Sequence, residues 1–303
     1  MAPERATSLQ SLPWGSTRPS HSMPKMATMW SAMHASRNID SPPSELYLDL
    51  LKRCLTREIF VDCPSTPTDC DLPRQSNRED GPYCWSIADT MIGSRRLDNL
   101  HECILRILAD GTPGDLMEAG VWRGGATIFM RAALAAYGDR SRRVIVADSF
   151  RGLPRPDADR YPADADVDLS NGAELAVPEN TVRHNFRRYG MLDDRVIFVP
   201  GWFHQSLPDA RVDRLAVLRI DADMYQSTID VLNAMYAKVS DGGFVIVDDY
   251  GAIPACRAAV DDFRARHAIE DELFWVDRTA VYWRTATRTA APERAAWYGE
   301  AKA

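Results

Sequence analysis

The chain contains 303 residues, of which 45% are hydrophobic, and this is enough material for one large α/β domain with extensions. Its formal net charge is −7 and its arginines are scattered, so the composition argues against nucleic acid as a partner. Apolar periodicity continues from about residue 85 to 285, which favours a single domain over two.

Residues 1–44 are rich in Ser, Pro, Met and Ala and contain no sustained apolar run. This composition excludes a secretory signal or membrane span in the segment and predicts a flexible arm. We therefore expect a cytoplasmic protein, without a membrane partner, whose six cysteines are reduced thiols. Cys63 and Cys70 lack the CxxC spacing and the nearby histidine pair of a zinc site.

An N-terminal helical region is expected at 45–110. Apolar residues recur at helical spacing over 45–60 and again over 96–111, where Gly111 marks the stop. The segment between these helices, 62–82, is rich in Pro, Asp and Ser and is predicted to be a loop.

Apolar runs then alternate with helical patterns through a core expected at 111–288. Near-continuous apolar strands separated by helices indicate a parallel sheet that is covered on both faces. A Pro- and Asp-rich insertion at 151–178 is too long for an ordinary connection and is typical of a lid, and 289–303 is expected to be a tail. The predicted strands are 115–121, 143–150, 195–201, 214–221 and 242–250, and the predicted helices are 124–138, 179–189, 225–239 and 254–267.

Two further strand-like runs, 272–277 and 280–285, are separated only by Arg278 and Thr279. A connection this short makes an antiparallel hairpin and excludes a parallel crossover. The expected fold class is therefore α/β, with a doubly wound, mostly parallel, seven-stranded sheet and an antiparallel C-terminal hairpin. That sheet resembles the one in class I S-adenosylmethionine-dependent methyltransferases.

The segment MEAGVWRGGAT, 117–127, ends the first strand and begins a helix. Gly120, Gly124 and Gly125 permit a tight turn and the close approach of a ligand at the carboxyl edge of the sheet. The spacing is not GxGxxG, so a dinucleotide is disfavoured.

Two acids beside this loop indicate the chemistry of a ligand. Glu118 precedes the turn, where a carboxylate suits a cationic group better than a phosphate. Asp148 ends the second strand, where an acid can accept hydrogen bonds from ribose hydroxyls. Together they fit S-adenosylmethionine. The alternative is that Glu118 pairs with an arginine and that Asp148 only ends a strand.

Asp221 ends the fourth strand, and Asp248 and Asp249 end the fifth. Adjacent parallel strands bring their carboxyl ends side by side, so these carboxylates should converge within reach of one ion. An oxygen-only ligand set selects a hard cation such as Mg²⁺ and argues against zinc.

Asp223 lies two residues beyond Asp221 and can face the same cavity. In that position it is a candidate general base for a hydroxyl whose pKa a cation lowers. The alternative is that Asp223 is the N-cap of the helix that follows.

These motifs together resemble the macrocin O-methyltransferase family, the metal- and S-adenosylmethionine-dependent sugar O-methyltransferases of antibiotic biosynthesis. The resemblance extends from about residue 45 to 285. It is carried by YLDLLKR, TMIGSRRLDNL, GDLMEAGVWRGGATIFM, ADSFRGLP, RYG, PGWFHQSLP, LAVLRIDADMYQST and GGFVIVDDYG.

The resemblance implies a role for each matching position. Asp221 and Asp223 would be catalytic, the former within a Mg²⁺ site and the latter as the base. The segment after ADSFRGLP would be a mobile lid, and the acceptor would be a glycosylated small molecule. The implied metal ligands are Asp221, Asp248 and Asp249, and the implied cofactor-binding residues are Thr90, Met91, Glu118, Gly120, Val121, Asp148, Ser149, Gly201 and Trp202.

One departure is Ala222, which stands where the family usually has glycine and bears on the aim of Asp223. The alternative functions are a metal-dependent O-methyltransferase for catechols, a non-catalytic nucleoside-binding protein, and a phosphohydrolase, which would need an anion cradle that the sequence lacks. His184 and His204 are interpreted as surface or packing residues. A homodimer that uses the N-terminal arm and helix is compatible with the sequence.

Overall fold

The computed structural model describes residues 40–60 and 86–286. Apart from residues 40–42, all of these belong to one compact unit, Pro43–Ala303. The predicted loop at 62–82, the tail at 289–303 and nearly all of the arm at 1–44 lie outside the described residues, as do Cys63 and Cys70. The cysteines that are described, Cys54, Cys103 and Cys256, are free thiols.

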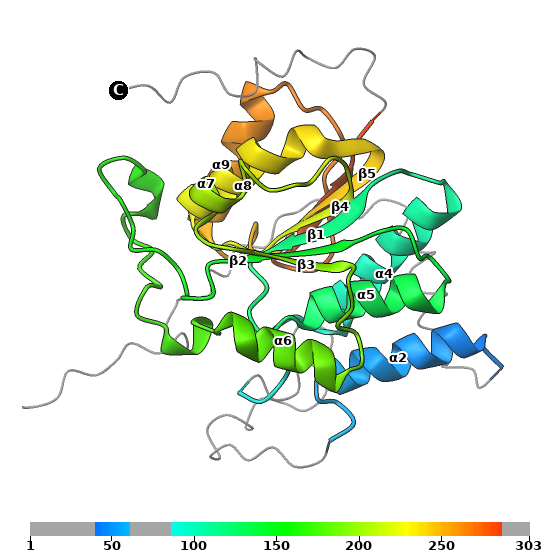
Figure 1. Cartoon of the computed structure of the whole chain (residues 1–303). Coiled ribbons are helices and arrows are strands. Elements are labelled where there is room, and N and C mark those ends of the chain that lie inside the picture. The colour runs from blue at the N-terminus through cyan, green and yellow to red at the C-terminus, as the bar shows by residue number, and fades with distance from the viewer. Residues whose placement is uncertain (1–39, 61–85, 287–303) are drawn as a thin grey trace, which may run out of the picture. The chain divides into compact units, whose positions relative to one another are not determined.

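Seven strands form one sheet in the order β3-β2-β1-β4-β5-β7-β6 (Figure 1). The first five are mutually parallel, and β7 is antiparallel to both of its neighbours. The predicted doubly wound sheet with an antiparallel C-terminal hairpin is thus confirmed. The strands are β1 Asp115–Ala119, β2 Val144–Asp148, β3 Val196–Pro200, β4 Leu215–Ile220, β5 Val239–Val247, β6 Phe274–Trp275 and β7 Val281–Arg284.

Helices cover both faces of the sheet, with α2, α4, α5 and α6 on one side and α7, α8 and α9 on the other (Figure 1). Helix α2 packs against α5. None of the described helices is both long enough and apolar enough to cross a membrane. The helices are α2 Pro43–Leu55, α4 Ser94–Ala109, α5 Gly125–Ala136, α6 Glu179–Arg188, α7 Phe203–Ser206, α8 Tyr225–Met235 and α9 Pro254–Arg266, with 3₁₀ turns η2 Pro162–Asp164, η3 Ala173–Leu175 and η4 Tyr236–Lys238.

The central strands are buried on both faces because their side chains alternate between two apolar cores. Met117 and Ala119 of β1 enter the core beneath α8 and α9, whereas Leu116 enters the core beneath α4 and α5. By the same alternation Glu118 and its register partner Arg219 point to the α4 side. Polar groups at the carboxyl edge therefore gather on the face that α4 covers.

The predicted elements differ from the observed ones mainly at their ends. Strands β1, β3, β4 and β7 are two residues shorter than predicted, β2 is three and β6 is four residues shorter, and β5 is shifted to an earlier start at Val239. The helix predicted at 225–239 ends at Met235 and continues as the turn η4. The turns within the insertion, η2 and η3, were not predicted because no apolar period marks such short elements.

Candidate active site

The chain crosses closely at the carboxyl edge of the sheet, and glycine makes this possible. Gly120 has a φ of +86°, and a Cβ there would lie 1.7 Å from the backbone oxygen of Asp221. A Cβ on Gly125 would lie 2.4 Å from the backbone oxygen of Asp89. The turn after β1 is therefore pressed against both the end of β4 and the segment 86–92.

Three aspartates converge at this edge. Asp221, Asp248 and Asp249 each present a carboxylate oxygen within 4.8 Å of the other two. Among the described residues, the buried atom Asp249 Oδ2 has no hydrogen-bond partner. A buried carboxylate oxygen without a partner is costly, and a cation is the group that would satisfy it.

Arg219 links these aspartates to Glu118. Its side chain is 2% exposed, donates to Asp221 Oδ2 at 2.9 Å, and forms ion pairs with Glu118 Oε1 and Asp248 Oδ1. The expected alternative, that Glu118 pairs with an arginine, is thus correct for one of its oxygens. The other oxygen, Oε2, is buried and unpartnered among the described residues, and it remains available to a cationic ligand.

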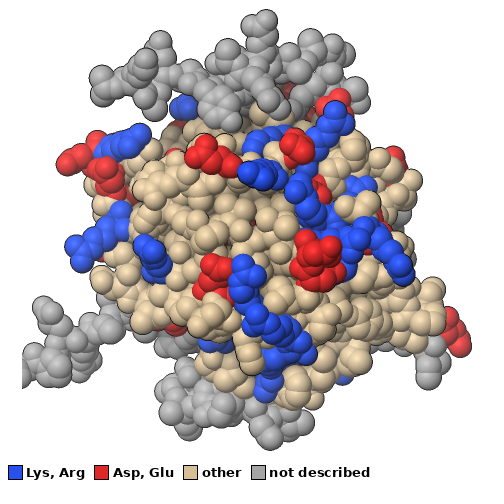
Figure 2. Space-filling model, in the orientation of Figure 1, with Lys and Arg blue, Asp and Glu red and all other residues tan. Residues whose placement is uncertain are grey.

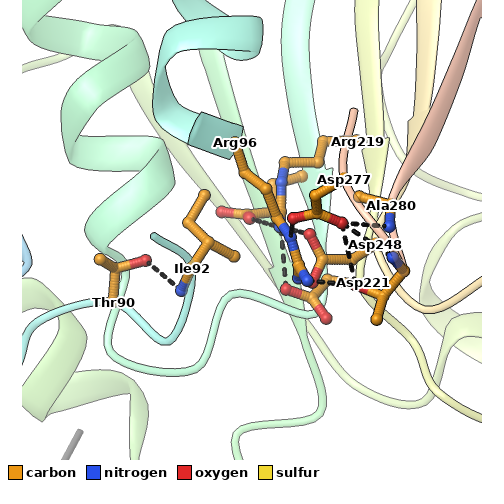
Figure 3. A network of polar contacts seen from close by, with 10 residues as sticks. Thr90, Ile92, Arg96, Arg219, Asp221, Asp248, Asp277 and Ala280 are labelled. Carbon is orange, nitrogen blue, oxygen red and sulfur yellow. Dashed lines mark hydrogen bonds and ion pairs between the residues drawn. The ribbon is translucent and has the colours of Figure 1, made fainter. Parts of the chain in front are cut away.

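A second arginine approaches Asp248 from helix α4, as Figure 3 shows. Arg96 pairs with Asp248 Oδ2 and donates through Nε to Asp277 Oδ2 at 2.6 Å. Asp277 in turn accepts the backbone N–H groups of Thr279 and Ala280, both at 2.8 Å, in the turn between β6 and β7. The C-terminal hairpin is therefore tied to the aspartate cluster through Arg96.

We refer to Glu118, Asp221, Asp223, Asp248 and Asp249 as the acidic site. Burial, followed by the charges of neighbouring carboxylates, raises the pKa of Asp223 to about 7 and the pKa of Asp249 well above its usual range. Burial raises the pKa of Glu118 to about 8, although Arg219 opposes the shift. Two arginines thus do not neutralise the site.

Asp223 does not cap helix α8. In the described structure the N-cap residue is Met224, whose side chain makes no hydrogen bond to the first turn of the helix. Instead, Asp164 of the insertion accepts the N–H groups of Tyr225 at 2.6 Å and Gln226 at 3.0 Å. The cap interpretation of Asp223 is therefore wrong, and its carboxylate lies near those of Asp221 and Asp248.

The backbone conformation at Ala222 shows whether an alanine in place of glycine strains the turn that carries Asp223. The left-handed residue of this turn is Asp223, with a φ of +57°, and Ala222 is not among the residues with positive φ. Aspartate tolerates that conformation better than most side chains do. The Cβ of Ala222 therefore causes no backbone strain at this position.

Asp148 shapes the glycine turn from strand β2. Its two oxygens accept the backbone N–H groups of Val121 and Phe150, both at 2.8 Å. The Ser149 hydroxyl also lies 3.4 Å from the oxygen that Phe150 contacts. The hydroxyl of Ser149 donates to the backbone of Gly152 at 2.6 Å and holds the same turn.

The remaining predicted cofactor-binding residues lie beside these acids. The backbone N–H of Gly201 donates to the Asp148 carbonyl at 2.9 Å, and partly buried Trp202 begins α7. Buried Thr90 and partly buried Met91 belong to the segment 86–92 that faces the glycine turn. Figure 1 shows this segment leading into α4.

Arg123 of the glycine turn fixes the segment 86–92. Its guanidinium donates to the carbonyls of Ala88 at 2.7 Å and Ser86 at 2.9 Å. The segment is therefore a wall of the site that is attached to the turn itself.

His184 and His204 are exposed, as expected for surface residues.

Charged side chains of both signs occur on the surface. On the face shown in Figure 2, basic and acidic side chains are interspersed around a largely uncharged centre.

An acid-lined carboxyl edge beside a glycine turn, on a seven-stranded sheet with antiparallel β7, defines a class I S-adenosylmethionine-dependent methyltransferase. The chain belongs to the macrocin O-methyltransferase family, because the family model described as "Macrocin-O-methyltransferase (TylF)" matches residues 66–285. The predicted family is therefore confirmed, and the protein is an O-methyltransferase.

Individual relatives give the same assignment. The chain is 51% identical to the 8-demethyl-8-(2,3-dimethoxy-alpha-L-rhamnosyl)-tetracenomycin-C 4'-O-methyltransferase of Streptomyces olivaceus, over 81% of this chain and 95% of the relative. It is 49% identical to the Mycinamicin III 3''-O-methyltransferase of Micromonospora griseorubida, over 79% of this chain and 96% of the relative. The solved structure of the O-methyltransferase NovP superposes with a TM-score of 0.75 at 46% identity, covering 80% of this chain and all of that one.

Four residues that the structure places at or beside the site were not predicted: Arg96, Asp164, Arg219 and Asp277, the last of which pairs with Arg96. Arg219 had a signal, since it is a charged residue inside the otherwise apolar run LAVLRI, and such a residue needs a buried partner. Arg96 and Asp164 had none, because their partners lie 152 and 61 positions away in sequence. Only the tertiary structure brings them to the acidic site.

Proposed function

We propose that this O-methyltransferase transfers the methyl group of S-adenosylmethionine to a sugar hydroxyl of a glycosylated natural product, in a Mg²⁺-dependent reaction. The names of the relatives support the acceptor class. One acts on a compound that carries a dimethoxy-rhamnosyl group, and another acts on mycinamicin III. A catechol acceptor has no comparable support.

The observation that carries the metal proposal is the unpartnered oxygen Asp249 Oδ2 within the cluster of Asp221, Asp248 and Asp249. Six carboxyl groups gather here: the five of the acidic site and that of Asp277. Among the described residues, the cations that form ion pairs with this group are Arg96 and Arg219. An excess of buried negative charge with oxygen donors fits a hard divalent cation. When bound, the ion would lower the pKa of an acceptor hydroxyl and stabilise negative charge on its oxygen.

The donor site is supported by a second unpartnered oxygen, Glu118 Oε2, which would accept a hydrogen bond from the cationic amino group of the cofactor. Asp148, held beside the glycine turn by the N–H groups of Val121 and Phe150, would accept the ribose hydroxyls. Thr90 and Met91 would close the site from the opposite wall. Together these groups favour a nucleoside with a positive charge over a nucleotide.

Asp223 is the proposed general base. Its carboxylate would accept the proton of the acceptor hydroxyl while the hydroxyl oxygen attacks the methyl carbon in line and the carbon–sulfur bond breaks. A pKa raised to about 7 keeps it basic enough to hold that proton at neutral pH. Much of the rate enhancement should come from positioning, since the methyl donor is already activated.

The decisive test is methyl transfer by the purified full chain, read by mass spectrometry. Rhamnosylated aromatic polyketides, other glycosides and simple catechols are offered with S-adenosylmethionine, with Mg²⁺ or with EDTA. We expect a mass gain of one methylene unit on the sugar of the rhamnosylated compounds only, restored after EDTA by Mg²⁺. Methylation of catechols alone would refute the acceptor class, and equal rates in EDTA would refute the role of the metal.

A further inference from the structure

The insertion 151–178 contains one aspartate that differs from all of its neighbours. Asp164 is 0% exposed and ends the turn η2. A carboxylate is seldom buried without a specific partner. The other aspartates of the insertion are exposed; they are Asp157, Asp159, Asp166 and Asp168.

The partners of Asp164 are the first two backbone N–H groups of helix α8. One carboxylate oxygen accepts from Tyr225 at 2.6 Å and the other from Gln226 at 3.0 Å. Such groups have no acceptor within their own helix, and a carboxylate also stabilises the positive end of the helix dipole. Because the cap residue Met224 has no side-chain oxygen, the insertion supplies the cap that the local sequence lacks.

These contacts lie next to the proposed reacting groups. Tyr225 is two residues beyond Asp223, at the carboxyl end of β4. The ring of Tyr161, three residues before Asp164, packs on that of Tyr225 with centroids 5.9 Å apart. Turn η2 also contacts α9. The middle of the insertion is thus docked beside Asp223.

A second attachment holds the far end of the insertion at the glycine turn. The indole N–H of Trp122 donates to the backbone carbonyl of Glu174 at 2.8 Å. Trp122 itself belongs to the turn and adopts a left-handed φ of +47°. The insertion is therefore fastened on the donor side by Trp122 and on the side of Asp223 by Asp164.

We propose that Asp164 is a positioning residue that fastens the insertion to helix α8 and so fixes the wall of the acceptor site beside Asp223. The inference rests on the proposed function only in placing the acceptor next to Asp223. The wall forms when the insertion is docked and opens when the contact between Asp164 and α8 is broken. The donor site does not depend on this contact.

The test compares Asp164→Asn with Asp166→Asn in the full chain. Asparagine keeps the shape of the side chain but can accept only one of the two N–H groups. The exposed Asp166 carboxylate makes no hydrogen bond or ion pair among the described residues. The probe substrate is p-nitrophenyl α-L-rhamnoside with S-adenosylmethionine. In Asp164→Asn we expect its KM to rise about tenfold, with kcat and the Kd of S-adenosylmethionine changed less than about threefold. Asp166→Asn should match the native chain.

Hydrogen exchange separates this proposal from the proposed function. Amides of 158–168 and of Tyr225 and Gln226 should exchange faster in Asp164→Asn and not in Asp166→Asn. Tyr161→Ala, which leaves the helix N-terminus intact, should change KM in the same direction by less. If the native chain fails to methylate the rhamnoside, the proposed acceptor is wrong, and faster exchange still supports the fastening. If Asp164→Asn loses stability while KM and exchange in the insertion stay native, the positioning role is wrong.

Discussion

Two polar clusters among the described residues differ in whether their buried atoms all have partners. The helical-cap cluster consists of Glu45, Lys52, Asp98, His101 and Tyr137 from helices α2, α4 and the end of α5. Lys52 Nζ lies 2.6 Å from Asp98 and 3.0 Å from His101 Nδ1, and His101 Nε2 lies 2.6 Å from the Tyr137 hydroxyl, which donates to Glu45. Among the described residues, no buried side-chain atom of this cluster lacks a partner.

The acidic site is also built from charged side chains, but some of its buried atoms have no hydrogen-bond partner among the described residues. Glu118 Oε2 and Asp249 Oδ2 are buried without a partner among the described residues, and carboxylates outnumber arginines. A complete network stabilises one conformation, whereas unpartnered oxygens cost stability until a ligand binds. The two clusters therefore differ in their missing partners rather than in the presence of buried charge as such.

The largest effect on activity is expected from replacing Asp249, which carries an unpartnered oxygen of the acidic site. Asp249→Asn keeps the size of the side chain but removes the charge of the unpartnered oxygen. We expect kcat/KM to fall about 10²- to 10³-fold, as for loss of a group that stabilises charge in the transition state. Mg²⁺ affinity, measured by isothermal titration calorimetry without acceptor, should fall as well.

The matched control for Asp249→Asn is Asp98→Asn, which removes an aspartate charge from the helical-cap cluster. Its loss should lower the free energy of unfolding without changing Mg²⁺ affinity or kcat. Equal losses of activity in the two variants would mean that the clusters do not differ in function. Native Mg²⁺ affinity in Asp249→Asn would refute the metal site.

Asp223→Asn should have the next largest effect. It removes the proposed base but none of the three proposed metal ligands, so kcat should fall about 10²-fold while Mg²⁺ affinity is retained. In the native chain the rate should rise as Asp223 loses its proton, with a pKa near 7 that a bound cation would lower. The pH–rate profile of the variant should lack this limb, and a profile that keeps it would assign the base to another group.

The fold could be predicted from the sequence almost completely, for a physical reason. Strands such as Leu215–Ile220 are buried on both faces and therefore read as continuous apolar runs, and the helices between them have their own period. The short gap predicted at Arg278 and Thr279 indicated the hairpin, although the observed connection between β6 and β7 is 276–280. Element ends were less accurate, because hydrogen bonds across the sheet, rather than local sequence, decide where β5 begins and ends.

The site could be predicted only in part. Asp221, Asp248 and Asp249 end neighbouring strands, so topology alone brings them together. The cap of α8 could not be predicted, since Asp164 reaches the helix from the insertion and no spacing rule connects residues 61 positions apart. From the sequence, Asp223 could therefore be either a base or the cap of α8. Only the tertiary structure shows that Asp164 caps this helix.

The helical-cap cluster should make the free energy of unfolding depend on pH, by about 2 kcal/mol. Burial, followed by the charge of Lys52, lowers the pKa of His101 to about 3, so the ring stays neutral in the folded chain and is protonated on unfolding below about pH 6.5. Stability from this group is complete above pH 6.5 and is lost as the pH falls toward 3. Between pH 7 and 5 the loss should be about 2 kcal/mol.

The measurement is urea unfolding at several pH values, with His101→Gln as the comparison. Glutamine offers an acceptor and a donor but does not titrate. The variant should be less stable than the native chain at pH 7 and should lose about 2 kcal/mol less between pH 7 and 5. An identical pH dependence in both proteins would show that the ring of His101 is not held neutral in the folded state.

The smallest effect should come from Ala222→Gly, which restores the residue that the family usually has. Ala222 is 5% exposed within the core beneath α8 and α9, and its φ is not positive. Losing a buried methyl group and freeing the unfolded backbone should together lower stability by about 1 to 2 kcal/mol. Because Asp223, not residue 222, adopts the left-handed conformation, the aim of the base should not change and kcat should stay within about twofold. A tenfold rise in kcat would instead show that the methyl group of Ala222 holds Asp223 away from its acceptor.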